Sequence, residues 1–331
     1  MPVAIAPFLL EPSRLISQRP LSGTTVVCSV LPVDSLGLVA PMDLPPSGEA
    51  RAAPVGPDPL RIVGLSALMA DTQGDRRIAI GLVDGPVDLQ HPGLAAATIR
   101  ALPLADPRTP ARTDDLAAMH GTFVAGILAA TICPACPLLL RTVVATEARD
   151  AAGPTAGDVA CAVVECVDAG ARIVNLSVAV RRADADDERA LTLALDHAAR
   201  RGTLVVAAAG NEATVGGSVL LRHPWVIPVA ACESDGSPMA ATNLGASIGR
   251  RGVMGPGTGL TGLAPGGGTT TLDGTSVATA LVTGAIALSW ASSPAHSGAD
   301  VRWAVGRAHA GRPSTIVPPL LRATAIREAL A

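Results

Sequence analysis

Hydrophobic and polar positions follow two different patterns, before and after about residue 60. The first part is rich in proline and shows little periodicity, apart from an apolar run at 24–30 that could make one strand. We expect a proline-rich N-terminal extension and linker over residues 1–60, followed by one folded domain over 61–331. An inhibitory pro-segment is the alternative for the first part, but the proline density near its end leaves little room for a packed domain.

The second part alternates between short, fully apolar runs and helical patterns. The apolar runs predict strands at 78–83, 138–144, 173–176, 203–208 and 226–230, and the helical patterns predict helices at 62–70, 120–131, 157–169 and 187–201. Strands of nearly continuous apolar residues that alternate with helices indicate an α/β fold with a doubly wound, mainly parallel sheet and helices on both faces. Such sheets bind ligands at the carboxyl ends of their strands.

Four polar residues stand where such a sheet would bind a ligand. Asp84 ends the first strand, and Asn211 follows the strand at 203–208. His120 opens a predicted helix, and Ser276 begins an apolar helix after a glycine turn. Each alone has an ordinary explanation, because Asp-Gly and Gly-Asn occur in turns and Ser or His can cap a helix.

Together these residues supply the chemistry of acyl transfer. A serine hydroxyl is a weak nucleophile until an imidazole accepts its proton, and a buried carboxylate orients that imidazole. The start of a helix and a nearby asparagine amide can both stabilise an oxyanion. We expect Ser276 as the nucleophile, His120 as the base, Asp84 as its orienting carboxylate and Asn211 as an oxyanion donor.

The local sequences around these residues resemble those of subtilisin-like serine proteases, in the same order Asp, His, Ser. The matching segments are Val83-Asp84 with His91-Pro92, His120-Gly121-Thr122, Ala209-Gly210-Asn211 and Gly274-Thr275-Ser276. The resemblance covers about residues 60–310. It implies that substrate binds between two segments, Ser177, Val178 and Ala179 on one side and Ala208, Ala209 and Gly210 on the other.

Within that family, Asp84-Gly85-Pro86-Val87-Asp88 is similar to the proteases that mature cyanobactins and related ribosomally made peptides. The resemblance implies an endopeptidase that removes a leader or tail from a precursor peptide. Cyclising members of that group carry a helical insertion between the Asp and His segments, and only 36 residues separate Asp84 from His120 here. Cleavage is therefore favoured over the alternatives, a macrocyclase or transpeptidase on the same fold and a catalytically silent binding module.

Three positions depart from the usual pattern of the family. Ala280 stands where most members have a proline, and Ala179 replaces a glycine in the substrate-binding wall, so substrate preference is expected to be unusual. Gly93 follows His91-Pro92 where an aspartate calcium ligand usually stands, and the associated loop is missing. We expect no calcium at that site and no other metal or cofactor.

Composition excludes several other classes of function. A net charge of −3, with no Tyr, two Phe and three Trp, argues against nucleic-acid binding. No unbroken apolar run approaches the length of a membrane span, and residues 1–10 make a poor secretory signal, so we expect a cytoplasmic protein. Cys133-Pro-Ala-Cys136 has no second cysteine pair or nearby histidine to complete a metal site, which favours a local disulfide or plain burial.

Overall fold

The computed structural model describes residues 58–102, 116–143, 154–178, 180, 184–310 and 315–331. The extension predicted for residues 1–60 lies almost wholly outside this part, and the boundary at residue 61 stays a prediction. The described chain begins at Asp58, which caps α1 (Pro59–Ile62) by accepting a hydrogen bond from the Leu60 N–H.

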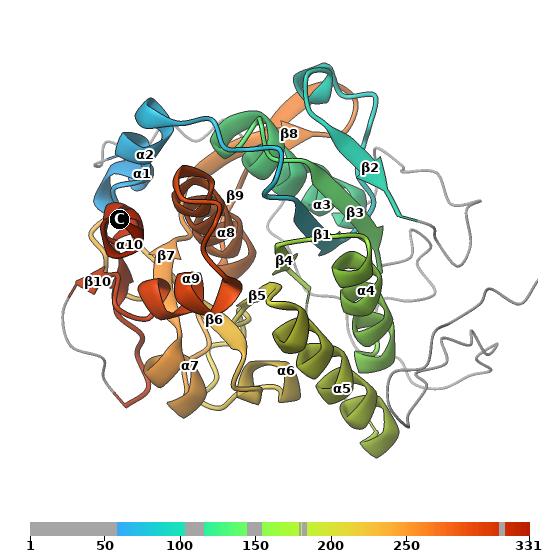
Figure 1. The fold of residues 1–331 in the computed structure, drawn as a ribbon, viewed down its shortest axis with the longest axis vertical. Coiled ribbons are helices and arrows are strands. Elements are labelled where there is room, and N and C mark those ends of the chain that lie inside the picture. The colour runs from blue at the N-terminus through green and yellow to red at the C-terminus, as the bar shows by residue number, and fades with distance from the viewer. Residues whose placement is uncertain (1–57, 103–115, 144–153, 179, 181–183, 311–314) are drawn as a thin grey trace, which may run out of the picture.

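Nine strands of the described chain form one sheet in the order β10-β11-β7-β6-β5-β4-β1-β3-β2 (Figure 1). Every neighbouring pair is parallel except β10 and β11, which confirms the predicted mainly parallel sheet. The strands are β1 (Ile80–Asp84), β2 (Ile99–Ala101), β3 (Leu138–Thr142), β4 (Ile173–Leu176), β5 (Leu204–Ala208), β6 (Val226–Cys232), β7 (Val253–Pro256), β10 (His309–Ala310) and β11 (Leu320–Leu321).

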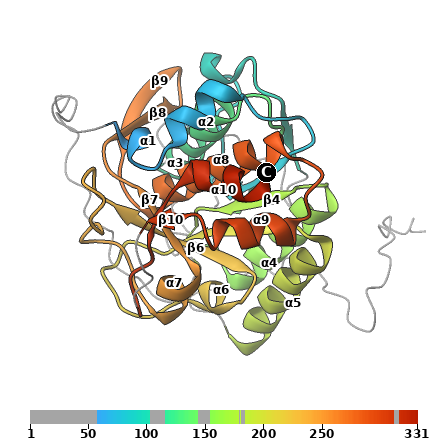
Figure 2. The ribbon, with the colours of Figure 1, turned by 60° about the vertical axis from the view of Figure 1, so that its left-hand side comes forward.

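Helices cover both faces of the sheet because the central strands are apolar on both sides. Ile80 and Leu82 of β1 pack into one hydrophobic cluster, and Val83 packs into the other. The first face is covered by α2 (Leu65–Asp71), α3 (Leu116–Gly126), α8 (Thr275–Ser292), α9 (Gly298–Val305) and α10 (Ala323–Leu330), the last two in front of the sheet in Figure 2. The second face is covered by α4 (Ala156–Asp168), α5 (Ala185–Arg201), α6 (Val219–Arg222) and α7 (Ala246–Arg251).

Two predicted helices have different bounds in the structure. The helix expected at 62–70 is divided into α1 and α2 at Gly64, which has a left-handed φ of 73°. The helix expected to open at His120 is already formed at Leu116, and it continues as a π-helical segment, η2 (Ile127–Ile132). The prediction that His120 opens the helix was therefore wrong, and His120 lies in its second turn.

Helix α8 crosses the centre of the molecule. Among the described residues, α8 is the one helix that is both long enough and apolar enough to span a membrane. However, 83% of that stretch is buried inside the fold. It packs against β4, β5, β6 and β7, and Trp290 near its end is fully buried. Its apolar character is that of a core helix.

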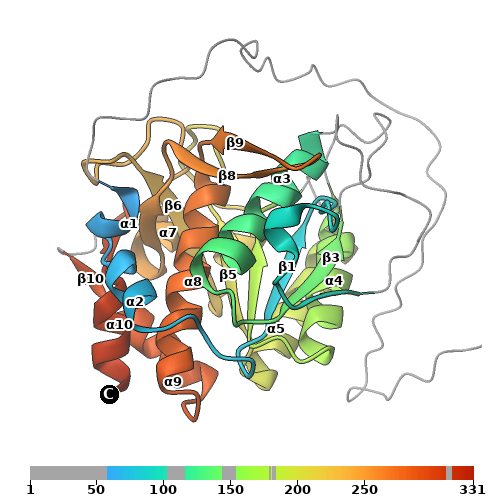
Figure 3. The same ribbon diagram turned by 90° about the horizontal axis from the view of Figure 1, so that it is seen from above.

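A two-stranded antiparallel hairpin, β8 (Leu260–Ala264) and β9 (Gly268–Leu272), lies across α3 (Figure 3). Glycine is required where the two elements meet, because a Cβ on Gly262 would lie 2.7 Å from the Phe123 ring. The hairpin is also tied to the loop after β1, since the Gly266 N–H donates to Asp88 Oδ2 at 2.9 Å. The hairpin is therefore fixed beside the loop that follows Asp84.

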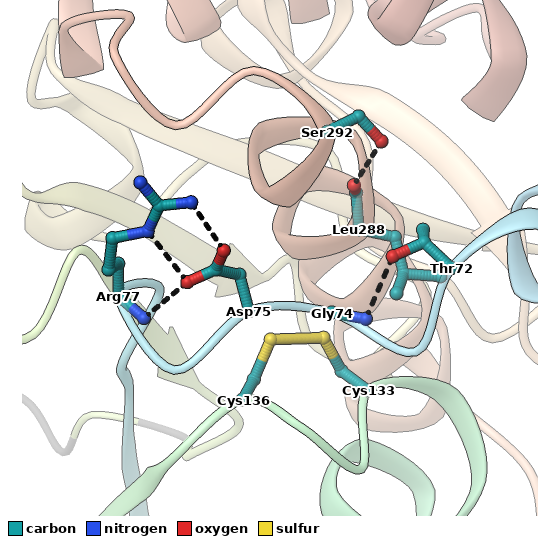
Figure 4. Close-up of a disulfide and its surroundings, with 8 residues drawn as sticks. All are labelled: Thr72, Gly74, Asp75, Arg77, Cys133, Cys136, Leu288 and Ser292. Atoms are coloured by element: carbon teal, nitrogen blue, oxygen red, sulfur yellow. Dashed lines mark hydrogen bonds and ion pairs between the residues drawn. A yellow bond between two sulfur atoms is a disulfide. The ribbon is translucent and has the colours of Figure 1, made fainter.

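Cys133 and Cys136 form a disulfide beneath the connection between α2 and β1 (Figure 4). Gly74 passes directly over it with φ of 101°, and a Cβ there would lie 2.6 Å from both sulfur atoms. Cys166 and Cys232 are buried thiols. Burial raises the pKa of each of these two thiols to about 12, so both are unreactive.

Candidate active site

Asp84 is the last residue of β1 and is 2% exposed. Its Oδ1 accepts a hydrogen bond from the Gly85 N–H at 2.6 Å and lies 2.7 Å from His120 Nδ1. Its Oδ2 is buried and has no hydrogen-bond partner within the described residues. The carboxylate is thus shielded from water and directed at one imidazole nitrogen.

Two glycines allow this pair to form. A Cβ on Gly85 would collide with the backbone carbonyl of Ala117 in α3, and a Cβ on Gly121 would collide with the carbonyl of Pro86. The loop after β1 and helix α3 therefore touch backbone to backbone, which only glycine permits at both positions. This close approach explains why glycine follows both the aspartate and the histidine in the sequence.

Opposing effects act on the pKa of His120. Burial alone would lower it, because the charged imidazolium loses solvation. The charge of Asp84 and its hydrogen bond raise it, and the net result is a pKa above the ordinary value of 6.5. His120 is therefore a stronger base than a free histidine.

Ser276 is the second residue of α8, and Gly274, with φ of 126°, occupies the capping position. Ser276 therefore does not cap the helix. Its Oγ donates a hydrogen bond to the Ser177 carbonyl at 3.3 Å and makes none to His120 in this structure. Such bonds are often long or absent before substrate binds, and rotation about one side-chain bond redirects the hydroxyl.

Neighbouring strands bring these residues to the same edge of the sheet. Strands β1 and β4 pair in parallel, with Val83 opposite Leu176. Asp84 ends the first, and Ser177, which holds Ser276, directly follows the second. Because paired strands lie about 4.8 Å apart, His120 and Ser276 are held by adjacent strand ends.

The Asn211 side chain is oriented by its own carbonyl. Its Oδ1 accepts a hydrogen bond from the Thr275 N–H at 2.9 Å, and Gly210, the preceding residue, donates its N–H to Thr275 Oγ1 at 3.2 Å. The amide nitrogen of Asn211 makes no hydrogen bond within the described residues, so its two donors are free. Asn211 and Ser276 line the same hollow.

That hollow has a volume of about 300 Å³ and lies between the segments predicted to bind substrate. It is lined by Ser177, Val178, Ala208, Ala209 and Gly210, which are five of the six predicted residues. The sixth, Ala179, lies outside the described residues. The other lining residues are Val180, Asn211, Glu212, Thr214, Gly216, Gly217, Ser218, Leu220, Asn243, Thr275 and Ser276.

Asn243 holds the wall of this hollow in place, a role that was not predicted. Its Oδ1 accepts hydrogen bonds from the backbone N–H groups of Glu212 and Thr214, at 3.1 and 3.0 Å. Its Nδ2 donates to the Ala209 carbonyl at 3.1 Å and to the Glu212 carboxylate. Asn243 lies about thirty residues away along the chain, so no local motif connects it with Asn211.

A buried polar network supports Ser276 from below. Asn175 in β4 donates from Nδ2 to Ser177 Oγ at 2.8 Å, and its Oδ1 accepts from Thr283 Oγ1 of α8 at 2.9 Å. The Ser177 hydroxyl in turn donates to the Ser276 carbonyl at 3.4 Å. Asn175 and Thr283 are fully buried, so the start of α8 is fixed to β4 by satisfied groups.

A metal ion has no evident ligand set in the described part of the chain. No group of three His, Cys, Asp or Glu side chains there is close enough to hold an ion. All described peptide bonds are trans, including the one before Ala280.

The model of the subtilase family matches residues 75–317, and the chain belongs to this family. The thermophilic serine proteinase of Bacillus sp. (strain AK1) is 29% identical over 245 residues, which are 71% of this chain and 57% of that protein. Two subtilisins, subtilisin amylosacchariticus and subtilisin J, match over 65% of their length, so the chain spans less than two thirds of the length of these three relatives.

Two solved structures share the fold at higher coverage. A mutant of the protease domain of PatA is 30% identical, with a TM-score of 0.71, and the match covers 78% of this chain and 96% of that one. The prenylagaramide maturation protease PagA is 27% identical, with a TM-score of 0.71, over 81% of this chain and 99% of that one. The fold is therefore the subtilisin-like α/β fold.

Proposed function

We propose that this subtilase is a serine endopeptidase whose catalytic residues are Asp84, His120 and Ser276. The observation that carries the proposal is the 2.7 Å contact from Asp84 Oδ1 to His120 Nδ1, next to a serine held at the start of α8. Asp84 fixes the imidazole so that Nε2 is left to accept the serine proton.

The reaction uses these groups in two stages. The hydrogen bond from Ser276 Oγ to the Ser177 carbonyl breaks. Ser276 Oγ then transfers its proton to His120 Nε2 and attacks the peptide carbonyl. The negative oxygen that forms is stabilised by the free amide N–H of Asn211. His120 then protonates the leaving amine, and water hydrolyses the acyl-enzyme with the same base.

The substrate we propose is a ribosomally made precursor peptide that loses a leader or tail. Two features support it: the Asp84-Gly-Pro-Val-Asp88 segment, and the similarity to PatA and to PagA, a maturation protease by its title. Asp88 connects this segment to helix α3 and to the β8–β9 hairpin. Its N–H donates to Thr122 Oγ1 of α3 at 2.9 Å, and its carboxylate accepts from the Gly266 N–H between β8 and β9. The substrate lies between Ser177–Val178–Ala179 and Ala208–Ala209–Gly210.

Hydrolysis is favoured over cyclisation by the short path from Asp84 to His120. The described residues on this path form η1 (Pro92–Leu94), β2 and the first residues of α3, while 103–115 lie outside the description. A ligase must exclude water from the acyl-enzyme, and water at about 55 M competes with any incoming amine.

A fluorophosphonate and a precursor peptide encoded beside this chain together test the proposal. The phosphonate should label the natural protein and leave Ser276→Ala unlabelled. Mass analysis of the peptide products should give linear fragments that together gain one water, and casein should be cut poorly. Absence of labelling would favour the silent binding module, and mainly macrocyclic product would favour the transpeptidase.

A further inference from the structure

A second hollow adjoins the candidate active site. It has a volume of about 840 Å³ and shares Gly216 and Gly217 with the first hollow. The remaining lining residues are Arg222, Ala246, Ser247, Arg250 and Arg251. We refer to these seven residues as the arginine groove. It opens beside the substrate pocket, across a wall made of two glycines.

Three guanidinium groups line the groove, and backbone carbonyls hold them in place. Arg222 donates to the Gly217 carbonyl at 3.2 Å, and Arg250 donates to the Ala246 carbonyl at 3.0 Å. Arg251 donates to the carbonyls of Leu221 and Arg222, at 2.8 and 3.1 Å, at the end of α6. Each guanidinium has five donors, so most remain available.

The positive charge of the groove is largely uncompensated by carboxylates of the described chain. Arg222 lies 4.0 Å from Glu188, and both side chains are about half exposed, so this contact is weak. Burial, and then repulsion by Arg302 and Arg250, lowers the pKa of Arg251 below its ordinary value. Like charges gathered in one hollow of a chain with net charge −3 create a local field that an anion would relieve.

We propose that the arginine groove binds an acidic segment of the peptide substrate while the neighbouring pocket holds the residue beside the cleaved bond. This rests on the proposed function, since it assigns a second contact to the same peptide. Carboxylates match the fork geometry of arginine, and several arginines in a row favour several acidic side chains. The volume of the groove exceeds that of a single small anion. Because Gly216 and Gly217 line both hollows, one extended peptide can occupy both.

Binding is measured on the full chain carrying Ser276→Ala, with a fluorescent hexaglutamate peptide as the probe. Hexaglutamine of the same length and inorganic phosphate serve as comparison ligands. We expect hexaglutamate to bind with an affinity that falls as salt rises, hexaglutamine to bind at least tenfold more weakly, and phosphate at the same concentration not to displace the probe. Displacement by phosphate would reduce the groove to a small-anion site and overturn the proposal.

The decisive variant is the double substitution Arg222→Gln with Arg250→Gln in the same background. Arg251 is kept because its guanidinium caps α6. The double variant should bind hexaglutamate about tenfold more weakly, with an unchanged melting temperature. Arg76→Gln with Arg200→Gln is the matched control, because it removes two exposed arginines outside the groove.

Equal affinity in the double variant and the control would overturn the proposal. This readout does not use the serine chemistry. Failure of the natural protein to react with a fluorophosphonate would overturn the proposed endopeptidase and leave the acidic-peptide site standing, whereas normal labelling without hexaglutamate binding would overturn only the site.

Discussion

His120 sets the pH dependence expected of this enzyme. The imidazole must be neutral to accept the serine proton, and Asp84 raises its pKa above the ordinary value of 6.5. Protonated His120 therefore persists to higher pH, and kcat/KM should fall with decreasing pH with a midpoint above 6.5. A pH–rate profile on a peptide substrate checks this.

Asp84→Asn provides the comparison for that profile. It removes the negative charge, so burial then lowers the pKa of His120 and the residual activity should show a lower midpoint. Its kcat should also fall about 10⁴-fold, because the amide favours the wrong imidazole tautomer. An identical midpoint in both proteins would contradict the assigned pairing.

Asn211 can be tested for donation to the oxyanion separately from its role in the turn. Asn211→Ala should lower kcat by about 10²–10³, as removal of one such donor does in subtilisin, with little change in KM. Asn211→Asp keeps an acceptor for the Thr275 N–H and replaces the amide donor by a carboxylate, which would also repel the oxyanion. We expect kcat to fall in both variants. A normal kcat in Asn211→Asp would show that Asn211 acts only as a turn residue and does not donate to the oxyanion.

The residues just discussed could be predicted because each stands in a local motif beside a strand end or helix start. Glu212 and Asn243 could not, since their roles come from hydrogen bonds between segments about thirty residues apart. An Asn between Thr and Leu has no local feature that separates a structural hub from an ordinary turn. The sequence therefore identified the groups that we propose to react and missed the side chain that holds the pocket wall.

The loop from Ala209 to Thr214 is the element most dependent on one side chain. Asn243→Ala leaves the N–H groups of Glu212 and Thr214 without their acceptor. Because the loop is exposed and water can replace part of the loss, we expect about 1 kcal/mol of lost stability. We also expect a fluorophosphonate to label Ser276 several-fold more slowly, since Asn211 belongs to this loop.

Thr214→Val is the control for Asn243→Ala, because it removes only the bond from Thr214 Oγ1 to Asn243 Oδ1. Its labelling rate should stay near that of the natural protein. Thermal melting and labelling rate are measured on both variants. Equal labelling rates in Asn243→Ala and the natural protein would show that the loop keeps its conformation without the Asn243 side chain.

Element boundaries were predicted less well than element types, and α3 shows why. A helix was expected from His120, but the backbone is helical from Leu116, and residues 116–119 are apolar as well. Leu116 is 58% exposed and only Ala118 is fully buried among residues 116–119, so their apolar side chains do not form one clear buried face. The contact between Gly85 and Ala117, which fixes this turn, is long-range and invisible in local sequence.

For the molecule as a whole, we expect stability to be independent of calcium at the usual subtilisin site. Gly93 stands where the aspartate ligand of that site usually stands, and His91 holds this segment in place. His91 Nδ1 accepts from the Gly93 N–H and its Nε2 contacts the Gly268 carbonyl, both at 2.9 Å. A chelator should therefore leave the melting temperature nearly unchanged. A fall of about ten degrees or more would reveal several kcal/mol of metal binding.

His91→Ala is the positive control for that measurement. It removes both contacts of a side chain that is 4% exposed and should lower the melting temperature whether or not a chelator is present. A chelator effect that appears only in the natural protein would place a metal at this segment after all.

Residues 211–218 are all exposed, whereas the helix that carries Ser276 is buried in the core. One side of the pocket can therefore vary in sequence without disturbing the packing that positions the proposed nucleophile. Over evolutionary time such a chain can acquire new peptide preferences through changes at 214–218, at little cost to its foldability. Relatives that diverge there should cut different peptides yet unfold at similar temperatures.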